Sequence, residues 1–269
     1  MNRLSIERQT QIASLLVEGV SLRATSRLTG AAINTVMNFA TDLGEACQIY
    51  QESVFHDLSC KRLQCDEIWS FVGCKEKNAT EEKQADGMGD AWTWVAVDAE
   101  TKLVPCWYVG PRDAKSAEIF MKELKSCLKN RVQLSTDGYK SYLTAVETAF
   151  GDEIDYGMLV KLYGELPDDK RKQFIGSTGE AIIGQPDPYH IRTGFVERQN
   201  LTMRMHMRRF TRKTNAFSKK IHNHKCAIAL HFMYYNFSRI HTTLGKTPAM
   251  AADVSNHAWT TKEMVMLLN

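Results

Sequence analysis

Apolar side chains recur every three to four positions along residues 5–18 and again along residues 32–50, which predicts two amphipathic helices. Gly19 ends the first of them. A short helix is expected between them over residues 21–28, followed by a tight turn at Gly30. A short helix, a glycine turn and a third helix match the spacing of a helix-turn-helix, and a plain three-helix bundle gives the same pattern.

The third predicted helix carries small polar side chains near its N-terminal end, on the face that points away from the core. Asn34, Thr35 and Asn38 lie opposite its apolar stripe and near its N-terminal end, where a recognition helix reads base edges. We therefore predict that they contact bases, within a helix-turn-helix domain over residues 1–50. That segment holds four basic and four acidic residues. Its charge does not favour DNA, so the plain bundle stays an alternative.

Strand-like and helix-like segments alternate through the centre of the chain. Short runs rich in β-branched and aromatic residues predict strands, and apolar residues at helical intervals predict helices. The predicted strands cover residues 63–72, 91–98, 103–109, 131–136 and 155–162, and the predicted helices cover residues 113–129 and 140–150. This order is typical of an α/β domain, with a mixed sheet and helices packed against it.

Glycine and proline interrupt this pattern in residues 164–194, which contain five glycines and three prolines. The weak periodicity there predicts a long insertion that forms a mobile loop. Two helices are expected afterwards, over residues 195–212 and 219–239. The second contains His222 and His224, which we expect to pack within it or to lie along its basic face.

Positive charge is concentrated in one segment. The sequence has 34 Lys and Arg, 31 Asp and Glu and a net charge of +3, yet residues 198–225 contain nine basic residues and no acid. The rest of the chain has 25 basic and 31 acidic residues. A basic strip on an acidic body is typical of polyanion binding. The predicted DNA-backbone contacts are Lys140, Arg198, Arg204, Arg208, Arg209, Arg212, Lys213, Lys219 and Lys220.

Three acidic residues stand at unusual positions. Asp66 lies inside an apolar predicted strand, Asp137 ends a later buried strand, and Glu197 begins the basic helix. An acid within a strand is costly unless it is solvated, paired or bound to a cation. Arg204 and Arg208 follow Glu197 by seven and eleven residues, so a continuous helix puts all three on one face. Carboxylates that converge from strand ends and a helix form an oxygen site for hard cations such as Mg²⁺.

Each acid also has a structural explanation. Asp66 and Glu67 fit a solvated pair at a sheet edge, and Asp137 followed by Gly138 is a common turn. Glu197 suits the N-terminus of a helix because of the helix dipole. What favours a joint site is their order: strand acid, strand-end acid, then helix acid followed by a basic helix.

Four segments resemble DDE transposases of bacterial insertion sequences, most closely the InsB-like group. They read CDEIW at 65–69, TDGYKSY at 136–142, FVERQNLTMRMHMRRFTRKTNAFSKK at 195–220 and YYNFSRIHTTLGKTPAMAA at 234–252. The third of these is the most specific, and the resemblance covers about residues 60–252. The chain departs from the pattern in its long insertion and in lacking the N-terminal cysteine zinc ribbon that some relatives carry.

The resemblance implies a ribonuclease-H-like fold and Mg²⁺-dependent DNA cleavage and strand transfer. The catalytic triad of the family falls on Asp66, Asp137 and Glu197, which would hold two Mg²⁺ ions, with Mn²⁺ as a substitute. The implied partners are double-stranded DNA, as element ends and as target, and further copies of the chain in a homodimer or larger oligomer. A nuclease that cuts without joining and a transposase-derived regulator without catalysis are the alternative functions.

The predicted organisation has four parts. They are a helix-turn-helix domain at 1–50, a linker at 51–62, a ribonuclease-H-like catalytic domain at 63–215 that includes the 164–194 insertion, and a helical C-terminal segment at 216–269. No apolar run approaches the roughly 20 residues of a membrane span, and seven scattered cysteines fit a reducing compartment. We expect a cytoplasmic, nucleoid-associated protein of a prokaryote that makes no membrane contact.

Overall fold

The computed structural model describes residues 4–166, 169–211 and 213–268, and the chain forms two compact units. The sheet unit consists of residues 56–68 and 93–199, and the helical unit consists of residues 1–55, 69–92 and 200–269. Each unit therefore combines segments that are distant in the sequence.

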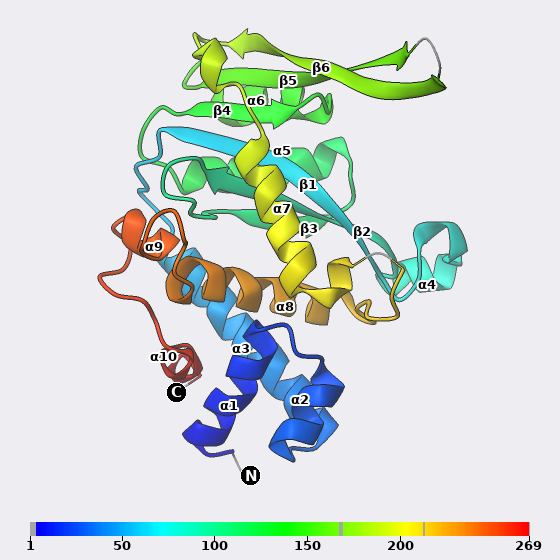
Figure 1. The fold of residues 1–269 in the computed structure, drawn as a ribbon, viewed down its shortest axis with the longest axis vertical. Coiled ribbons are helices and arrows are strands. Elements are labelled where there is room, and N and C mark those ends of the chain that lie inside the picture. The colour runs from blue at the N-terminus through cyan, green and yellow to red at the C-terminus, as the bar shows by residue number, and fades with distance from the viewer. Residues whose placement is uncertain (1–3, 167–168, 212, 269) are drawn as a thin grey trace. The chain divides into compact units, whose positions relative to one another are not determined.

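A mixed six-stranded sheet with the order β3-β2-β1-β4-β5-β6 underlies the α/β architecture (Figure 1). The strands are β1 (Arg62–Val72), β2 (Gly89–Asp98), β3 (Trp107–Gly110), β4 (Gln133–Asp137), β5 (Asp155–Leu166) and β6 (Asp169–Ile183). β4 pairs in parallel with β1 and β5, and β6 runs antiparallel to β5. The α/β prediction is confirmed, and the arrangement is consistent with a ribonuclease-H-like fold.

The core of the sheet unit lies where α5 (Ala114–Ser126) and α6 (Ser141–Phe150) pack against the sheet. The Asp113 side chain caps α5 by accepting a hydrogen bond from the Ser116 N–H at 2.8 Å. Trp94 of β2 contacts Phe120 and Tyr142, with ring centroids 6.0 and 5.6 Å apart. The start of α7 (Gly194–His206) belongs to the sheet unit, and Figure 1 shows it in front of the sheet, with α5 behind.

β5 and β6 pair antiparallel over most of their length, so the prediction of a mobile loop over residues 164–194 is wrong for residues 164–166 and 169–183. Residues 167 and 168 lie outside the described residues. Large apolar side chains of these two strands are exposed, among them Tyr163, Phe174 and Ile175. The segment therefore lacks the alternation of buried and exposed positions that identifies a strand packed on a core. Hydrogen bonds to the neighbouring strand, rather than burial, define β6.

The helical unit begins with the three expected helices, α1 (Ile6–Val17), α2 (Leu22–Thr29) and α3 (Ile33–Val54). Ser5 and Ser21 cap the first two through their hydroxyl oxygens. Gly30 ends α2 at φ +67°, a left-handed conformation that favours glycine. The three predicted helices are confirmed, and α3 runs four residues further than expected. The helix-turn-helix assignment stays a prediction.

The basic helix is shorter than predicted because α7 ends at His206 and Met207 adopts an extended backbone. The remaining elements are η1 (Glu76–Asn78), α4 (Glu81–Ala85), η2 (Pro188–His190), η3 (Arg208–Phe210), α8 (Ile221–Met233), the π-helix η4 (Tyr234–Ser238), α9 (Pro248–Ala251) and α10 (Thr261–Met266). α8 with η4 covers the second predicted helix of the C-terminal region.

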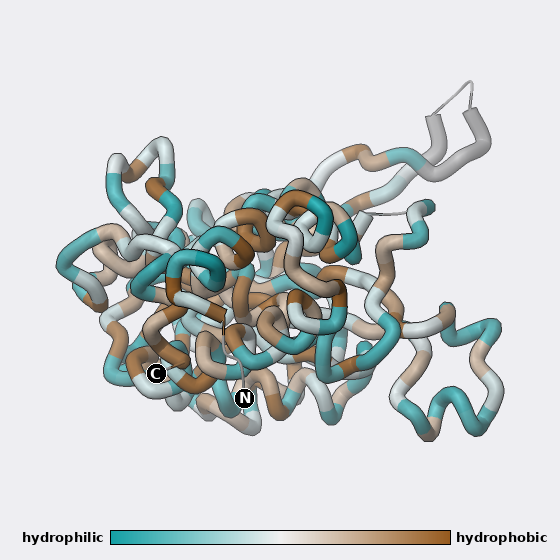
Figure 2. The backbone as a smooth tube through the Cα atoms, turned by 90° about the horizontal axis from the view of Figure 1, so that it is seen from below, coloured by the Kyte–Doolittle hydropathy of each residue, from teal (hydrophilic) through white to brown (hydrophobic). Residues whose placement is uncertain are grey.

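Hydrophobic and hydrophilic stretches alternate along the backbone (Figure 2), as expected for elements that bury one face. Among the described residues, no helix has both the length and the apolar character needed to cross a lipid bilayer.

Candidate metal centre and nucleic-acid interface

Asp66 and Asp137 lie side by side because β1 and β4 pair in parallel and in register. The last positions paired between β1 and β4 are Cys65 and Thr136, so Asp66 and Asp137 each follow this pair by one residue. Carboxylate oxygens of Asp66, Glu67 and Asp137 all lie within 4.8 Å of one another. Two acids separated by 71 positions in the sequence thus form one oxygen cluster.

Glu67 belongs to this cluster as a buried side chain, which excludes the solvated-pair explanation. Its side chain is 1% exposed, and Oε2 accepts a hydrogen bond from Arg112 Nε at 3.2 Å. Burial raises the pKa of Glu67 to about 7, and the negative charges of Asp137 and Asp66 add to this. Tyr142 and Arg112 partly offset the rise, although neither Glu67 Oε1 nor the Tyr142 hydroxyl makes a hydrogen bond of normal geometry.

Arg112 contacts both Glu67 of β1 and the turn that follows Asp137 of β4. Besides its ion pair with Glu67, its guanidinium lies over the Tyr139 ring, 3.9 Å from the ring centroid. The Tyr139 hydroxyl donates to the Arg112 carbonyl oxygen at 2.9 Å, and the Tyr139 N–H donates to Asp137 Oδ1 at 3.0 Å. The turn after β4 is thereby held against the segment before α5. Gly138 faces open space, since a Cβ there would meet nothing within 4 Å.

Glu197 lies outside the cluster formed by the other acids and bonds to a lysine. Its Oε1 accepts hydrogen bonds from Lys161 Nζ at 2.7 Å and from Thr193 Oγ1 at 3.0 Å. The pKa of Lys161 is raised, mainly by this bond to Glu197 and further by the charge of Asp66. The Lys161 ammonium therefore lies in the electrostatic field of two of the three predicted metal ligands.

The start of α7 is attached directly to β1 through Gln64. The Gln64 side chain is buried, and its Oε1 accepts hydrogen bonds from the N–H groups of Phe195 and Val196 at 2.7 and 3.2 Å. Residues two apart in a strand point to the same face, so Gln64 and Asp66 share the face on which α7 begins. This contact places the first turn of α7, which carries Glu197, over the strand that carries Asp66.

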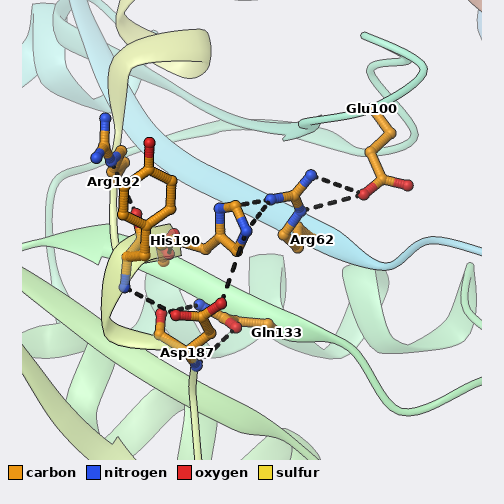
Figure 3. Close-up of polar contacts among 8 residues, drawn as sticks. Arg62, Glu100, Gln133, Asp187, His190 and Arg192 are labelled. Atoms are coloured by element: carbon orange, nitrogen blue, oxygen red, sulfur yellow. Dashed lines mark hydrogen bonds and ion pairs between the residues drawn. The ribbon is translucent and has the colours of Figure 1, made fainter.

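A polar network holds the segment that leads into α7 (Figure 3). Arg62 lies at the start of β1. Its Nη2 is 2.9 Å from Glu100 Oε1, and its Nη1 is 2.7 Å from His190 Nε2. Gln133, at the start of β4, donates to the Asp187 carbonyl at 3.1 Å and accepts from the Asp187 N–H at 3.0 Å. These bonds join the entry to α7 to both strands that carry the aspartates.

Comparison with known proteins supports the family expected from the sequence. No protein-family model matches the chain. It is 28% identical over 167 residues to the insertion element iso-IS1n protein InsB of Shigella dysenteriae, an alignment that covers 61% of this chain and 88% of that protein. The chain is therefore distantly similar to this insertion element protein. The resemblance predicted from the sequence is confirmed, at a low level of sequence identity.

The predicted DNA contacts of this InsB-like chain are mostly at the surface. The exposed ones are Asn34, Thr35, Asn38, Lys140, Arg198, Arg208, Lys213, Lys219 and Lys220, and Arg204 is half-buried. Arg212 lies outside the described residues. The expectation that Arg208 shares a helical face with Glu197 is wrong, because α7 ends at His206. Arg204 does lie in α7.

Arg209 forms hydrogen bonds with other residues of the protein. Its Nη1 donates to Ser218 Oγ at 2.7 Å and to the Asn223 carbonyl oxygen at 3.3 Å. Enclosure of the guanidinium lowers its pKa to about 10. The prediction that Arg209 contacts a DNA phosphate is therefore not retained.

The side chains that position the acids could not be recognised in the sequence. Gln64, Arg112 and Lys161 are polar or charged residues in segments without a distinctive motif, and their partners lie 36 to 131 positions away. The one available signal was Glu67, which directly follows Asp66 inside an apolar strand.

Proposed function

We propose that this protein is a transposase that cuts DNA at the ends of an insertion element and joins those ends to target DNA. The observation that carries the proposal is the cluster of Asp66, Glu67 and Asp137 oxygens, directly after the last residue pair between the parallel strands β1 and β4. The InsB relationship supports a role in transposition, because the relative is an insertion element protein.

The donor set suits a hard divalent cation. Asp66, Glu67 and Asp137 offer only carboxylate oxygens, which Mg²⁺ and Mn²⁺ prefer over nitrogen and sulfur ligands. The buried Glu67 Oε1 without a well-formed hydrogen bond is the kind of atom that a cation satisfies. Divalent ions bound there would lower the pKa of an attacking water or 3′-hydroxyl and neutralise charge on the phosphodiester.

The residues of the chain supply position and charge. Asp66 and Asp137 provide the paired carboxylates, and Glu197 is the proposed third ligand on the adjoining helix. Lys161 bonds to Glu197 Oε1 at 2.7 Å, and we propose that this ion pair opens when Glu197 joins the other acids. Arg112 keeps Glu67 and the turn after Asp137 in place. Such positioning accounts for much of the rate in phosphoryl transfer.

The substrate proposed here is double-stranded DNA, both as element ends and as target. Exposed Arg208, Lys213, Lys219 and Lys220 would contact phosphates, and the open space at Gly138 allows a DNA backbone to approach. Two ends and a target must be handled together, so we expect a homodimer or larger assembly on DNA.

The decisive experiment compares cleavage and joining by purified protein with DNA that carries the ends of its own element. Glu197→Gln and Asp66→Asn should each reduce Mg²⁺-dependent cleavage by about 10²-fold or more while DNA retention survives, because electrostatic groups of this kind are worth 10²–10³-fold in rate. Glu180→Gln, an exposed acid in β6, should act like the wild type.

Pre-cut ends separate the alternative functions. A transposase joins them to target DNA, whereas a nuclease without joining activity does not, and a regulator neither cuts nor joins. Full strand transfer by Glu197→Gln would remove Glu197 from the proposed site.

A further inference from the structure

The helical unit contains a second cluster of potential metal ligands, with a different chemistry from the carboxylate site. Glu45 lies on α3, and His222 and Cys226 lie on α8. His222 Nε2 is 2.9 Å from Glu45 Oε1 and 3.7 Å from Cys226 Sγ, and the three potential ligand atoms are all within 4.8 Å of one another.

The backbone holds these three side chains in a defined arrangement. His222 and Cys226 are four residues apart on one helix, so they share a face. Gly44 precedes Glu45, and a Cβ on Gly44 would lie 2.6 Å from the Cys226 Cβ and 2.4 Å from its carbonyl oxygen. α3 and α8 can therefore approach this closely only because residue 44 has no side chain. A hydrogen bond from Asn223 to Thr41, at 3.3 Å, adds a contact one turn away on α3.

The donor atoms match a borderline transition metal rather than Mg²⁺. Thiolate, imidazole and carboxylate are the three ligand types of zinc sites, whereas Mg²⁺ takes oxygen donors. Ligands at zinc bond lengths of about 2.0–2.3 Å, arranged tetrahedrally, lie roughly 3.3–3.8 Å apart. The 3.7 Å between Cys226 Sγ and His222 Nε2 falls in this range.

An ion could reach this cluster from solvent. The side chains of His222 and Glu45 are 56% and 51% exposed, whereas Cys226 is buried beneath them. In this arrangement the Cys226 sulfur is the inner ligand, and His222 and Glu45 are the two outer ligands. The fourth coordination position is open to water.

We propose that Glu45, His222 and Cys226 bind one Zn²⁺-class ion that joins α3 to α8. The site is separate from the proposed catalytic cluster and does not depend on the proposed transposase activity. Its expected effect is to tie α3, which carries the predicted base contacts Asn34, Thr35 and Asn38, to the helix that follows the basic segment.

Co²⁺ titration of chelator-treated, full-length protein tests the proposal, because cobalt reports thiolate ligation by a charge-transfer band in the near ultraviolet. The wild type should bind one Co²⁺ with this band, and Zn²⁺ should displace it. Cys226→Ser should abolish the band, and His222→Ala should weaken binding by at least about 10-fold. Cys74→Ser, at a half-buried thiol that is not part of the cluster, is the control and should leave the titration unchanged.

Thermal unfolding gives a second measurement that does not depend on one variant folding well. Zn²⁺ should raise the unfolding temperature of the wild type and of Asp66→Asn, but not that of Cys226→Ser. The proposal is overturned if the wild type shows no charge-transfer band, or if Cys226→Ser keeps it. Either result would leave His222 and Glu45 as a surface ion pair. Loss of DNA cleavage in Asp66→Asn with intact Co²⁺ binding separates this site from the proposed catalytic one.

Discussion

At the scale of single residues, buried polar side chains determine the positions of the acidic residues in the proposed site. Gln64 is the clearest case, because one amide oxygen accepts two N–H groups at the start of α7. The first N–H groups of a helix have no partners within it, so a buried helix start needs an acceptor from elsewhere. The side chain of β1 supplies it, two residues before Asp66.

Replacing Gln64 tests this positioning role. Gln64→Leu should lower the free energy of unfolding by about 1–3 kcal/mol, because N–H groups at the start of α7 lose their acceptor. It should also reduce Mg²⁺-dependent DNA cleavage, since Glu197 loses its placement. Gln64→Glu keeps an acceptor at the same position and should recover part of both properties. Equal loss by the two variants in chemical denaturation and cleavage assays would argue against the contact.

His224 shows how a buried histidine is kept neutral. Its Nδ1 is 2.8 Å from Ser218 Oγ and its Nε2 is 3.1 Å from Ser70 Oγ, while the Ser70 hydroxyl donates to the Ala91 carbonyl oxygen. The Ser70 oxygen therefore accepts from Nε2–H, which leaves Nδ1 as the acceptor. Burial, with the charge of Arg209, lowers the pKa of His224 to about 3.

This lowered pKa predicts acid sensitivity with a definite sign. The folded pKa lies below the unfolded value of about 6.5, so the stabilising contribution is complete above pH 6.5 and is lost as the pH falls towards 3. Between these limits the wild type should lose up to about 1.4 kcal/mol per pH unit for this histidine. In urea titrations, His224→Gln should be less stable at pH 7 but fall less steeply, and the exposed His56→Gln should keep the wild-type slope.

At the scale of secondary-structure elements, the close contact between α3 and α8 depends on a glycine, which has no side chain. α3 and α8 meet at Gly44 and Cys226, and Gln51 of α3 donates to the Ala229 carbonyl of α8 at 3.1 Å. Apolar spacing along each helix predicts which face is buried, but it carries no information about which helix covers that face.

Gly44→Ala tests the helix contact. The added methyl group would lie 2.4 Å from the Cys226 carbonyl oxygen, so we expect a loss of about 1–3 kcal/mol from overpacking. Gly194→Ala is the matched control, because a Cβ there meets nothing within 4 Å. Thermal unfolding of both variants checks the difference. Similar stability of the two variants would mean that the helices separate without cost.

The sequence predicted helices and strands correctly where one face of the element is buried and the other is exposed. It failed where this contrast is absent. α5 and α6 have one buried face and agree with their predicted positions within a few residues. β6 was missed because its described side chains, residues 173–183, are mostly exposed and its strand character comes from pairing with β5. α7 was predicted too long because the apolar spacing continues through Phe210, although the helix stops at His206.

At the scale of the whole molecule, charge distribution is the property most directly linked to the proposed partner. The basic segment 198–225 stands against an otherwise acidic sequence. Neutralising DNA phosphates releases counterions, so each phosphate contact adds to the salt dependence of binding. This salt dependence requires only exposed positive charge, so it is expected for every rival DNA-binding function as well.

Salt titration of DNA binding measures this contribution. Arg208→Ala combined with Lys220→Ala removes two exposed charges of the basic segment and should lower the slope of log K against log salt by about 0.9 for each lost phosphate contact. Lys122→Ala, which removes an exposed lysine of α5 paired with Glu118, should keep the wild-type slope. An unchanged slope in the double variant would show that the segment does not contact phosphate.

By itself, the sequence determined the helices and strands with one buried face, the InsB-like resemblance and the three acids that resemblance singles out. Only the tertiary structure decided which groups meet. It brought Asp66 next to Asp137, buried Glu67 against Arg112, joined Glu197 to Lys161 and assembled Glu45 with His222 and Cys226. The reason is physical: local spacing sets the direction in which a side chain points, whereas strand register and helix contact set what it reaches.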